Sequence, residues 1–467
     1  MYGGLYDPGH SSSSPDGFRK DVQSLVRELG VRVVRYPGGN FVSGYKWEDG
    51  VGPVEHRPVR LDLAWQSIEP NTFGLNEFMR WAEQVDVEPM LAVNLGTRGV
   101  PEAVSLLEYA NFPSGSKYSD LRIAHGHRDP YAVKLWCLGN EMDGPWQLGH
   151  KPAGEYGRLA AETAKAMKLV DPSIELVVCG SSHERMPTFG WWESQVLEEA
   201  FDYVDYVSLH GYYAKPDDDR IAYLASADVM DEFIEGVIAT CDHVAVRRHN
   251  RRRLRLSFDE WNVEPRSELM SQSWTFAPSL SEETYTAEDA VVIGNLLISL
   301  LRHSDRVAIA CLAQLVNVLA PIRAEQGGAW RQTIFFPFAL TAHYARGDVL
   351  RVEPRTSAMA WSKTRGEVKP VDATATRDPR TGAISIFAVN RSPSTAILTT
   401  TVAGDLTYRV IDHQVMGGHE LTRTNTLTAQ QRCTPVPSTN HVIQGKDIEA
   451  ELPPASWAML RLSPVMT

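Results

Sequence analysis

Over its first 347 residues the chain alternates short apolar runs with longer amphipathic stretches, and this alternation limits the folds open to it. Seven apolar runs of strand length begin near residues 31, 90, 133, 174, 203, 253 and 306. Segments with apolar residues at helical spacing lie at 16–29, 75–87, 99–110, 155–169, 191–200, 220–247 and 288–303. Strands that alternate with helices pair in parallel through right-handed crossovers. The sequence therefore predicts an α/β fold built on a parallel sheet.

A polar residue stands at the end of each predicted strand. These residues are Asn40, Asn94, Glu141, Ser181, His210, Glu260 and Gln314. A doubly wound sheet gathers its site at one switch point, whereas a barrel collects polar residues from the carboxyl ends of many strands. We therefore expect a (β/α)8 TIM barrel. Because the runs above number seven and such a barrel has eight strands, we expect the first strand to be missing from this chain.

The pattern changes near residue 348, after a predicted helical stretch at 330–346. Short alternating runs follow at 383–389, 396–402, 406–411 and 457–462, with Gly, Pro, Asn and Asp between them. That pattern is typical of an antiparallel β-sandwich. We expect two domains: an N-terminally truncated catalytic barrel over residues 1–347 and a C-terminal β-sandwich over residues 348–467.

Glu141 and Glu260 are the two carboxylates that end apolar strands. A charge in that position costs free energy unless another group pairs with it or uses it. Two carboxylates on facing strands suit glycoside hydrolysis, in which one protonates the leaving oxygen and the other attacks or activates water. The alternative is that each glutamate only forms an ion pair. We favour the catalytic interpretation, and we expect no metal and no cofactor.

Five longer motifs surround these glutamates. They are Arg35-Tyr-Pro-Gly-Gly-Asn40, Trp47-Glu-Asp-Gly50, Gly139-Asn-Glu-Met-Asp-Gly-Pro-Trp146, Asp259-Glu-Trp-Asn262 and Ala313-Gln-Leu-Val-Asn317. Together they resemble the α-L-arabinofuranosidases of glycoside hydrolase family 51. The resemblance implies a barrel followed by a sandwich. It also implies a retaining, exo-acting enzyme that removes terminal non-reducing α-L-arabinofuranosyl residues from arabinoxylan, arabinan or their oligosaccharides.

The resemblance gives each matching residue an expected role. Glu141 is the acid/base and begins the reaction protonated near neutral pH, and Glu260 is the nucleophile. The positions that bind the furanose or orient the carboxylates are Arg35, Asn40, Asn140, Tyr212 and Gln314. Trp65 matches a wall of the pocket.

Other residues are interpreted from their own surroundings in the sequence. His210 either orients a catalytic carboxylate or is a hydrogen-bonded core histidine, and we favour the first interpretation. Trp146 and Trp261 are expected to be further walls of the pocket. The aspartates at 217–219 are expected in a solvated loop.

The chain departs from the family pattern in two places. Residues 263–267, Val-Glu-Pro-Arg-Ser, follow the Glu260 motif where the family has an aromatic residue that helps to close the pocket. The family also has a strand before the Tyr2 motif, ending in a Glu-His pair that binds the sugar. Two alternatives therefore stay open: another retaining glycosidase of the same barrel clan, such as an endoglucanase or β-xylosidase, and a catalytically impaired sugar-binding remnant.

Composition narrows the partners and the compartment. The net charge of −12 argues against nucleic-acid binding, because no basic stripe is present to neutralise phosphates. No apolar run reaches membrane-spanning length, and the five cysteines are odd in number without metal-ligand spacing. We expect a cytoplasmic protein that acts on arabinose-containing oligosaccharides or polysaccharide side chains. The resemblance further implies a homo-oligomer, commonly a hexamer.

Overall fold

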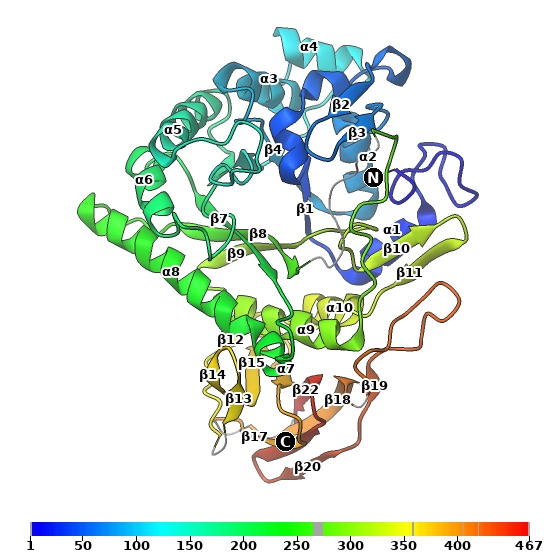
Figure 1. The fold of residues 1–467 in the computed structure, drawn as a ribbon, viewed down its shortest axis with the longest axis vertical. Coiled ribbons are helices and arrows are strands. Elements are labelled where there is room, and N and C mark those ends of the chain that lie inside the picture. The colour runs from blue at the N-terminus through cyan, green and yellow to red at the C-terminus, as the bar shows by residue number, and fades with distance from the viewer. Residues whose placement is uncertain (1, 265–273, 357–358, 405, 419, 466–467) are drawn as a thin grey trace.

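The computed structural model describes residues 2–264, 274–356, 359–404, 406–418 and 420–465. Its main sheet has seven parallel strands in chain order around a barrel (Figure 1). They are β1 (Val33–Tyr36), β4 (Glu88–Ala92), β5 (Leu135–Leu138), β6 (Glu175–Val178), β7 (Tyr206–Tyr213), β8 (Arg255–Val263) and β9 (Val307–Leu312). All seven predicted strands are thus confirmed, and each pairs with the strand that precedes or follows it in the sheet along the chain.

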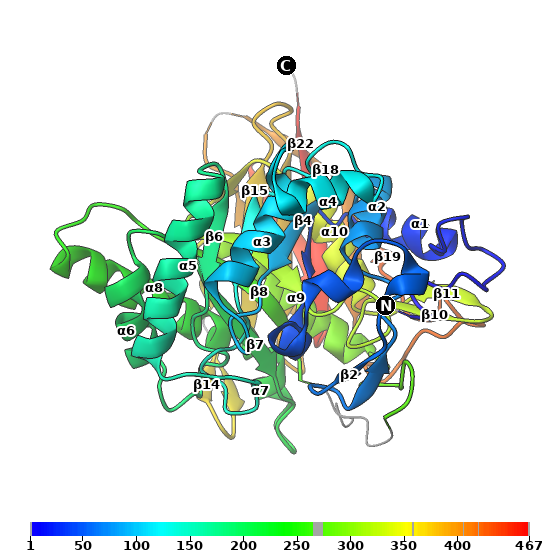
Figure 2. The same ribbon diagram turned by 90° about the horizontal axis from the view of Figure 1, so that it is seen from above.

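Helices cover the outside of this sheet (Figure 2). They are α1 (Lys20–Leu29), α2 (Leu75–Val85), α3 (Val100–Asn111), α4 (Lys117–Ala124), α5 (Ala153–Val170), α6 (Trp191–Ala200), α7 (Arg220–Leu224), α8 (Ser226–Arg247), α9 (Ala287–Arg302) and α10 (Phe335–Tyr344). The single helix predicted over 220–247 is in fact two. They meet at Ala225. There the Ser226 hydroxyl donates a hydrogen bond to the Tyr223 carbonyl, one of the last carbonyl groups of α7.

The helix predicted over 330–346 is wrong at its start. Residues 330 and 331 belong to β11 (Gly328–Arg331), which forms a hairpin with β10 (Ile322–Glu325). Gln326 and Gly327 make the two-residue connection, a length that favours a tight hairpin turn. A second small hairpin, β2 (Arg60–Asp62) and β3 (Ser67–Glu69), stands at the carboxyl end of the barrel.

Apolar side chains fill part of the barrel interior. An interior apolar cluster comprises Val42, Met90, Ala92, Leu135, Cys137, Val177, Tyr206 and Ile309. The sheet is open on one side, because β1 and β9 are its two ends and no pairing joins them among the described residues. The expectation of seven strands in place of eight therefore matches the sheet as it stands.

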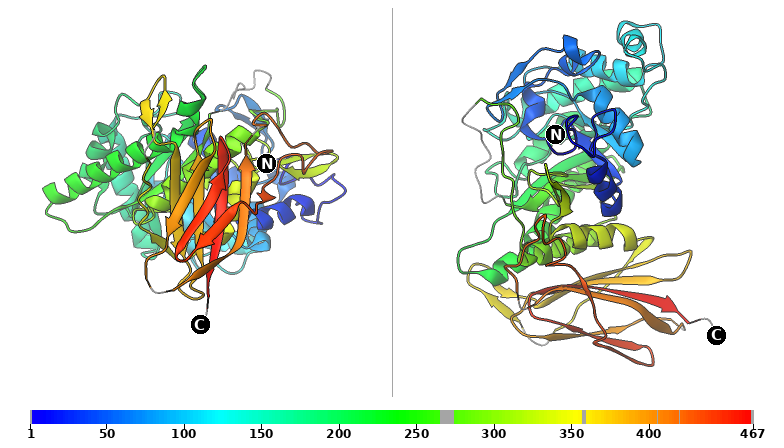
Figure 3. Two further views of the ribbon diagram at one scale, coloured as in Figure 1. Left: turned by 90° about the horizontal axis from the view of Figure 1, so that it is seen from below. Right: turned by 90° about the vertical axis from the view of Figure 1, so that its right-hand side faces the viewer.

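The described C-terminal residues form a larger and a smaller antiparallel sheet (Figure 3), besides a separate two-stranded hairpin. The larger contains β12 (Asp348–Leu350), β15 (Val371–Arg377), β16 (Ile384–Asn390), β22 (Ser456–Pro464), β18 (Tyr408–Gly417) and β19 (Val436–Pro437) in that order, and the smaller contains β17 (Ala396–Thr401), β21 (Asp447–Leu452) and β20 (His441–Gln444). The larger sheet packs on α9. A Cβ at Gly294 of α9 would collide with the buried Trp457 indole, so glycine permits this close approach.

Polar contacts also join the two parts. Arg391 is 1% exposed and pairs with Asp372 at 2.9 Å and with Asp228 of α8 at 2.8 Å.

The expectation that Asp219 lies in a solvated loop is wrong. Asp219 is buried and accepts hydrogen bonds from Ser362 at 2.9 Å and from the Thr364 amide at 2.8 Å. Both partners lie at a hairpin of β13 (Ala360–Ser362) and β14 (Gly366–Val368), which sequence spacing alone does not place beside residue 219.

No helix in the described part of the chain combines the length and the apolar character needed to cross a membrane.

Candidate active site

Glu141 lies just beyond β5 in a constrained turn. Gly139 and Glu141 both have positive φ, 99° and 43°, and the second value is unusual for a residue with a side chain. Such a conformation persists only where the surroundings enforce it, and it is common at functional sites. The carboxylate is held on both oxygens, by the Trp146 indole N–H at 2.6 Å and by His210 Nδ1 at 2.9 Å.

Glu260 lies on β8 and is also held on both oxygens. Arg35 of β1 donates from Nη1 to Oε1 at 2.8 Å, and the Tyr212 hydroxyl of β7 donates to Oε2 at 2.9 Å. Arg35 donates from Nη2 to Asn140 Oδ1 at 2.7 Å, so one guanidinium links the regions of both glutamates. This arrangement fixes the direction in which the Glu260 carboxylate points.

The two glutamates face each other closely. A carboxylate oxygen of Glu141, a carboxylate oxygen of Glu260 and a nitrogen of His210 all lie within 4.8 Å of one another. A separation of this size matches glycosidases in which one carboxylate attacks the sugar directly, since inverting enzymes keep their carboxyl groups about 6.5–9.5 Å apart to admit a water.

His210 bridges three carboxylates at the centre of the site. Its Nε2 is 3.0 Å from Asp259, and its Nδ1 is 3.6 Å from Glu260 as well as 2.9 Å from Glu141. Burial alone would lower the pKa of His210, but the charge of Glu260 and the hydrogen bonds to Asp259 and Glu141 raise it to about 10. The histidine therefore carries a proton near neutral pH, and its interpretation as a group that orients a carboxylate fits this geometry.

The protonation expected for Glu141 is wrong for the resting site. Burial alone would raise the pKa of Glu141, but the hydrogen bond from His210 and the charge of His210 lower it below the usual value. His210, whose pKa is raised, lies within hydrogen-bonding distance of Glu141. The sequence could not show this, because His210 and Glu141 are 69 residues apart.

The remaining expected residues lie around this centre. Asn140 is fully buried and its amide contacts Asn40 Oδ1 at 3.3 Å. Trp65 and Gln314 line the same cavity as Arg35 and Glu260. Trp261 does not form a wall: its ring is fully buried in the core, because alternation along β8 points it away from the face that carries Glu260.

Sequence reasoning missed one functional group, Asp259. It is 3% exposed, receives the Nε2 hydrogen bond of His210 and lies 3.8 Å from Arg35 Nε. Burial would raise the pKa of Asp259, but Arg35 and His210 lower it. A signal was present, since Asp259 immediately precedes Glu260 and a second acid at a buried strand end also needs a partner.

Glu141, His210 and Glu260 offer enough ligand atoms for a metal ion on distance alone. Both nitrogens of His210 are already hydrogen-bonded to carboxylates, and Glu260 is paired with a guanidinium. Two cationic groups, Arg35 and His210, thus lie among three carboxylates, Glu141, Asp259 and Glu260, in one hydrogen-bonded network.

Comparisons with known proteins agree with this geometry. Residues 25–227 match the model of the alpha-L-arabinofuranosidase 1 domain, and residues 259–456 match the alpha-L-arabinofuranosidase C-terminal domain. The chain is 50% identical to an intracellular exo-alpha-(1->5)-L-arabinofuranosidase of Acetivibrio thermocellus, over 99% of this chain and 93% of the relative. The corresponding protein of Bacillus subtilis is 49% identical over the same shares.

Solved structures give the same result. A family 51 alpha-L-arabinofuranosidase from Bifidobacterium longum superposes with a TM-score of 0.94 at 43% identity, covering 99% of this chain and 93% of that one. An alpha-L-arabinofuranosidase from Thermotoga maritima, solved as an arabinose complex, superposes with a TM-score of 0.87 at 32% identity. The match covers 100% of this chain and 94% of that one.

Proposed function

The chain belongs to the α-L-arabinofuranosidases of glycoside hydrolase family 51, and from this membership we propose that it is a retaining, exo-acting α-L-arabinofuranosidase. Its substrates are terminal non-reducing α-L-arabinofuranosyl residues on arabinoxylan, arabinan or their oligosaccharides. The observation that carries the proposal is the close pair of carboxylates, Glu141 and Glu260, at the carboxyl ends of two barrel strands.

Glu260 is the nucleophile in this proposal. Arg35 and Tyr212 bind its two oxygens, which keeps the carboxylate oriented for attack on the anomeric carbon. The attack forms a glycosyl–enzyme ester while the bond to the leaving oxygen breaks, and water later hydrolyses the ester with retention. Holding the nucleophile in place before the reaction removes part of the entropic barrier.

Glu141 is the general acid and then the general base. His210 supplies the proton to Glu141 across their hydrogen bond, and Glu141 passes it to the leaving oxygen. When Glu260 becomes an ester it loses its negative charge, which is the strongest of the influences that hold the proton on His210. Glu141, left ionised, then takes a proton from the attacking water.

In this proposal Asn140, Asn40 and Gln314 bind the furanose, and Trp65 forms a wall of the furanose site. Asn140 is fixed by Arg35, so its amide is available in one orientation. A hydrogen bond to the 2-hydroxyl strengthens as the oxocarbenium-like transition state forms, so it favours the reaction more than binding.

Three further parts of the proposal rest on the relatives or on the sequence. Curated relatives are named intracellular enzymes, and we propose the same compartment for this chain. We also propose that the chain forms a homo-oligomer, with a hexamer as the first candidate, and that the domains divide between residues 347 and 348. Light scattering after size exclusion tests the oligomeric state directly.

A panel of 4-nitrophenyl glycosides tests the activity itself. We expect turnover of the α-L-arabinofuranoside and little turnover of the β-xyloside or β-cellobioside. Preferential hydrolysis of either β-glycoside would contradict the proposal and favour another retaining glycosidase of the same barrel clan. Absence of turnover with retained binding of arabinose would favour a sugar-binding protein.

A further inference from the structure

Two histidines face each other between the larger and the smaller sheet of the C-terminal part. His413 lies on β18 and His441 on β20, and their ring centres are 5.5 Å apart with the ring planes at 64°. His413 stands opposite Leu460 in its sheet, and His441 stands opposite Ala450. Residues that are paired across strands share a face of the sheet, and Leu460 and Ala450 belong to one buried apolar cluster. Both rings therefore point into the layer between the sheets.

The buried ring nitrogens of this pair have no hydrogen-bond partner. Both nitrogens of His413 and Nδ1 of His441 are buried, and within the described part of the chain none of the three is hydrogen-bonded. The His413 side chain is also almost fully enclosed, since the residue is 3% exposed. A neutral imidazole has one N–H donor and one acceptor nitrogen, and leaving such groups unpaired in a buried layer costs free energy. Native proteins keep few such groups, so three together indicate a bound partner such as an ion.

The protonation state of His413 suits a metal ligand. Burial and the neighbouring His441 lower the pKa of His413 to about 4, and the charge of Asp412 only partly opposes them. His413 is therefore neutral near neutral pH. A neutral imidazole offers the lone pair of one nitrogen to a metal ion, and histidine is the commonest metal ligand in proteins.

The spacing of the two rings allows them to share one ion. A zinc ion about 2.0–2.1 Å from a ring nitrogen lies about 3.2 Å from the centre of that ring, so two rings that share one ion have centres at most about 6.4 Å apart. The observed separation of 5.5 Å is within this limit. Imidazole nitrogen is a ligand that Zn²⁺, Ni²⁺ and Cu²⁺ accept, whereas Mg²⁺ and Ca²⁺ prefer oxygen ligands. The donor set therefore favours a transition metal.

The pair lies at a border of the sandwich, where water can supply further ligands. Among the described residues β19 is an end strand of the larger sheet and β20 an end strand of the smaller one (Figure 1). The Ser438 amide donates to the His413 carbonyl at 2.8 Å, so the segment that joins β19 to β20 runs past the pair. Val436 and Val442 on these strands are exposed, and His441 is only half-buried. An ion with two protein ligands at this border completes its coordination with water.

We propose that His413 and His441 are the protein ligands of a late first-row transition-metal ion such as Zn²⁺. The ion binds one nitrogen of each ring and thereby links β18 of the larger sheet to β20 of the smaller one. It acts as a structural link within the C-terminal part of the chain. Because the pair lies outside the barrel strands that carry Glu141 and Glu260, the proposal does not rest on the proposed function.

The first measurement is calorimetric titration of ZnCl₂ into the 467-residue chain after dialysis against EDTA. The parent is compared with His413→Leu, with His441→Gln and with the matched control His343→Gln, which changes an exposed histidine of α10 that contacts the Glu28 carbonyl. Other histidines also bind zinc, so the signal is the one equivalent that differs between variants. We expect the parent and His343→Gln to bind this equivalent, and both pair variants to bind it at least about tenfold more weakly, since even loss of a group behind a ligand weakens metal binding about 10- to 100-fold.

The second measurement is thermal unfolding with and without ZnCl₂. Zinc should raise the thermal midpoint of the parent and of His343→Gln but not of the two pair variants, because a ligand that binds only the folded state stabilises it. In EDTA, His413→Leu should unfold at no lower temperature than the parent, because an apolar side chain replaces two unpaired buried nitrogens.

Three results would overturn the proposal: equal zinc binding in the parent and both pair variants, no binding of Zn²⁺, Ni²⁺ or Cu²⁺ by the parent, and a His413→Leu variant that unfolds earlier than the parent in EDTA while zinc has no effect on either. The last result would show that His413 only packs in the core. If His413→Leu does not fold, His441→Gln decides alone, because His441 is half-buried on an end strand. Zinc binding by a chain that does not hydrolyse an aryl α-L-arabinofuranoside would support the metal site and reject the proposed function.

Discussion

Replacing Arg35 by lysine is predicted to damage the site while keeping its charge. Arg35 uses two different nitrogens, one for Glu260 at 2.8 Å and one for Asn140 at 2.7 Å, and its side chain is 6% exposed. A lysine ammonium is a single point of charge and cannot reach both partners in the same geometry. We expect Arg35→Lys to keep the ion pair with Glu260 and to release Asn140.

The size of the effect follows from the bond that is lost. A hydrogen bond to a charged group contributes about 1.5–3 kcal/mol. If the loss is felt in the transition state, kcat/KM falls about 10- to 150-fold, since each 1.36 kcal/mol is a factor of ten. In the proposed mechanism Glu260 and Asn140 act most strongly on the transition state, so the fall should be mainly in kcat.

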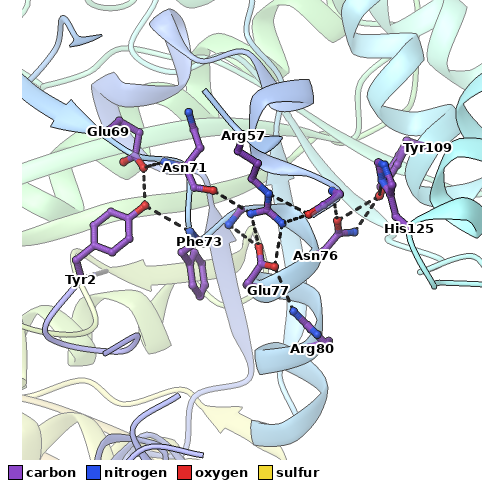
Figure 4. Close-up of polar contacts among 12 residues, drawn as sticks. Tyr2, Arg57, Glu69, Asn71, Phe73, Asn76, Glu77, Arg80, Tyr109 and His125 are labelled. Atoms are coloured by element: carbon purple, nitrogen blue, oxygen red, sulfur yellow. Dashed lines mark hydrogen bonds and ion pairs between the residues drawn. The ribbon is translucent and has the colours of Figure 1, made fainter. Parts of the chain in front are cut away.

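The assay is steady-state hydrolysis of an aryl α-L-arabinofuranoside, with rates referred to the folded fraction from circular dichroism. Arg57→Lys is the matched control. Arg57 is also buried and paired through two nitrogens, with Glu77 at 2.9 and 3.0 Å, but it lies in the separate network of Figure 4. We expect Arg57→Lys to lower the thermal midpoint and to leave kcat/KM of the folded protein nearly unchanged.

Two results would refute this reasoning. One is an Arg35→Lys variant whose kcat/KM stays within about threefold of the unchanged chain, below the lower limit set by one charged hydrogen bond. The other is an equal loss in Arg57→Lys, which would show that the activity follows general stability and not the orientation of Glu260.

Three further predictions concern single residues. Glu141→Ala should form the glycosyl–enzyme from an activated aryl glycoside but hydrolyse it slowly, and added azide should restore turnover. If no azido-sugar of retained configuration forms, Glu141 is not the acid/base. His210→Phe should move the basic limb of the pH profile of kcat/KM to lower pH, because the proton now held by His210, with a pKa of about 10, would be held by a carboxyl group alone. A basic limb at unchanged pH would show that His210 does not supply the proton. Burial opposes ionisation of Asp219, but hydrogen bonds from Ala222 and Thr364 lower its pKa to about 2, so the stabilisation it gives is full above the unfolded pKa near 4 and is lost as pH falls through 2. Asp219→Asn should therefore unfold at lower denaturant concentration than the parent at pH 7, and the difference should shrink as pH falls from about 4 to about 2; a difference that does not change with pH in denaturant titrations would contradict this.

The parts of the fold that the sequence predicts are those fixed by local patterns. Apolar runs such as 133–138 must be buried, and helical segments between them force parallel pairing, so the strand order followed without long-range information. Glu141 and Glu260 were predicted for the same reason, because a charge at a buried strand end needs a use.

The rest depends on contacts between distant segments. The state of Glu141 is set by His210, and the burial of Asp219 by a hairpin 143 residues further along the chain. The left-handed backbone at Glu141 carries no glycine to signal it. Trp261 is core because of the pleat of β8, which is fixed only once the pairing with β7 is known.

The most direct test of the central claim is the configuration of the first product. Hydrolysis of an aryl α-L-arabinofuranoside, followed by proton NMR before mutarotation, should show α-L-arabinofuranose first, because two inversions at a Glu141–Glu260 pair give net retention. Appearance of the β-anomer first would contradict the assignment of Glu260 as a nucleophile and, with it, the mechanism derived from the close carboxylate pair.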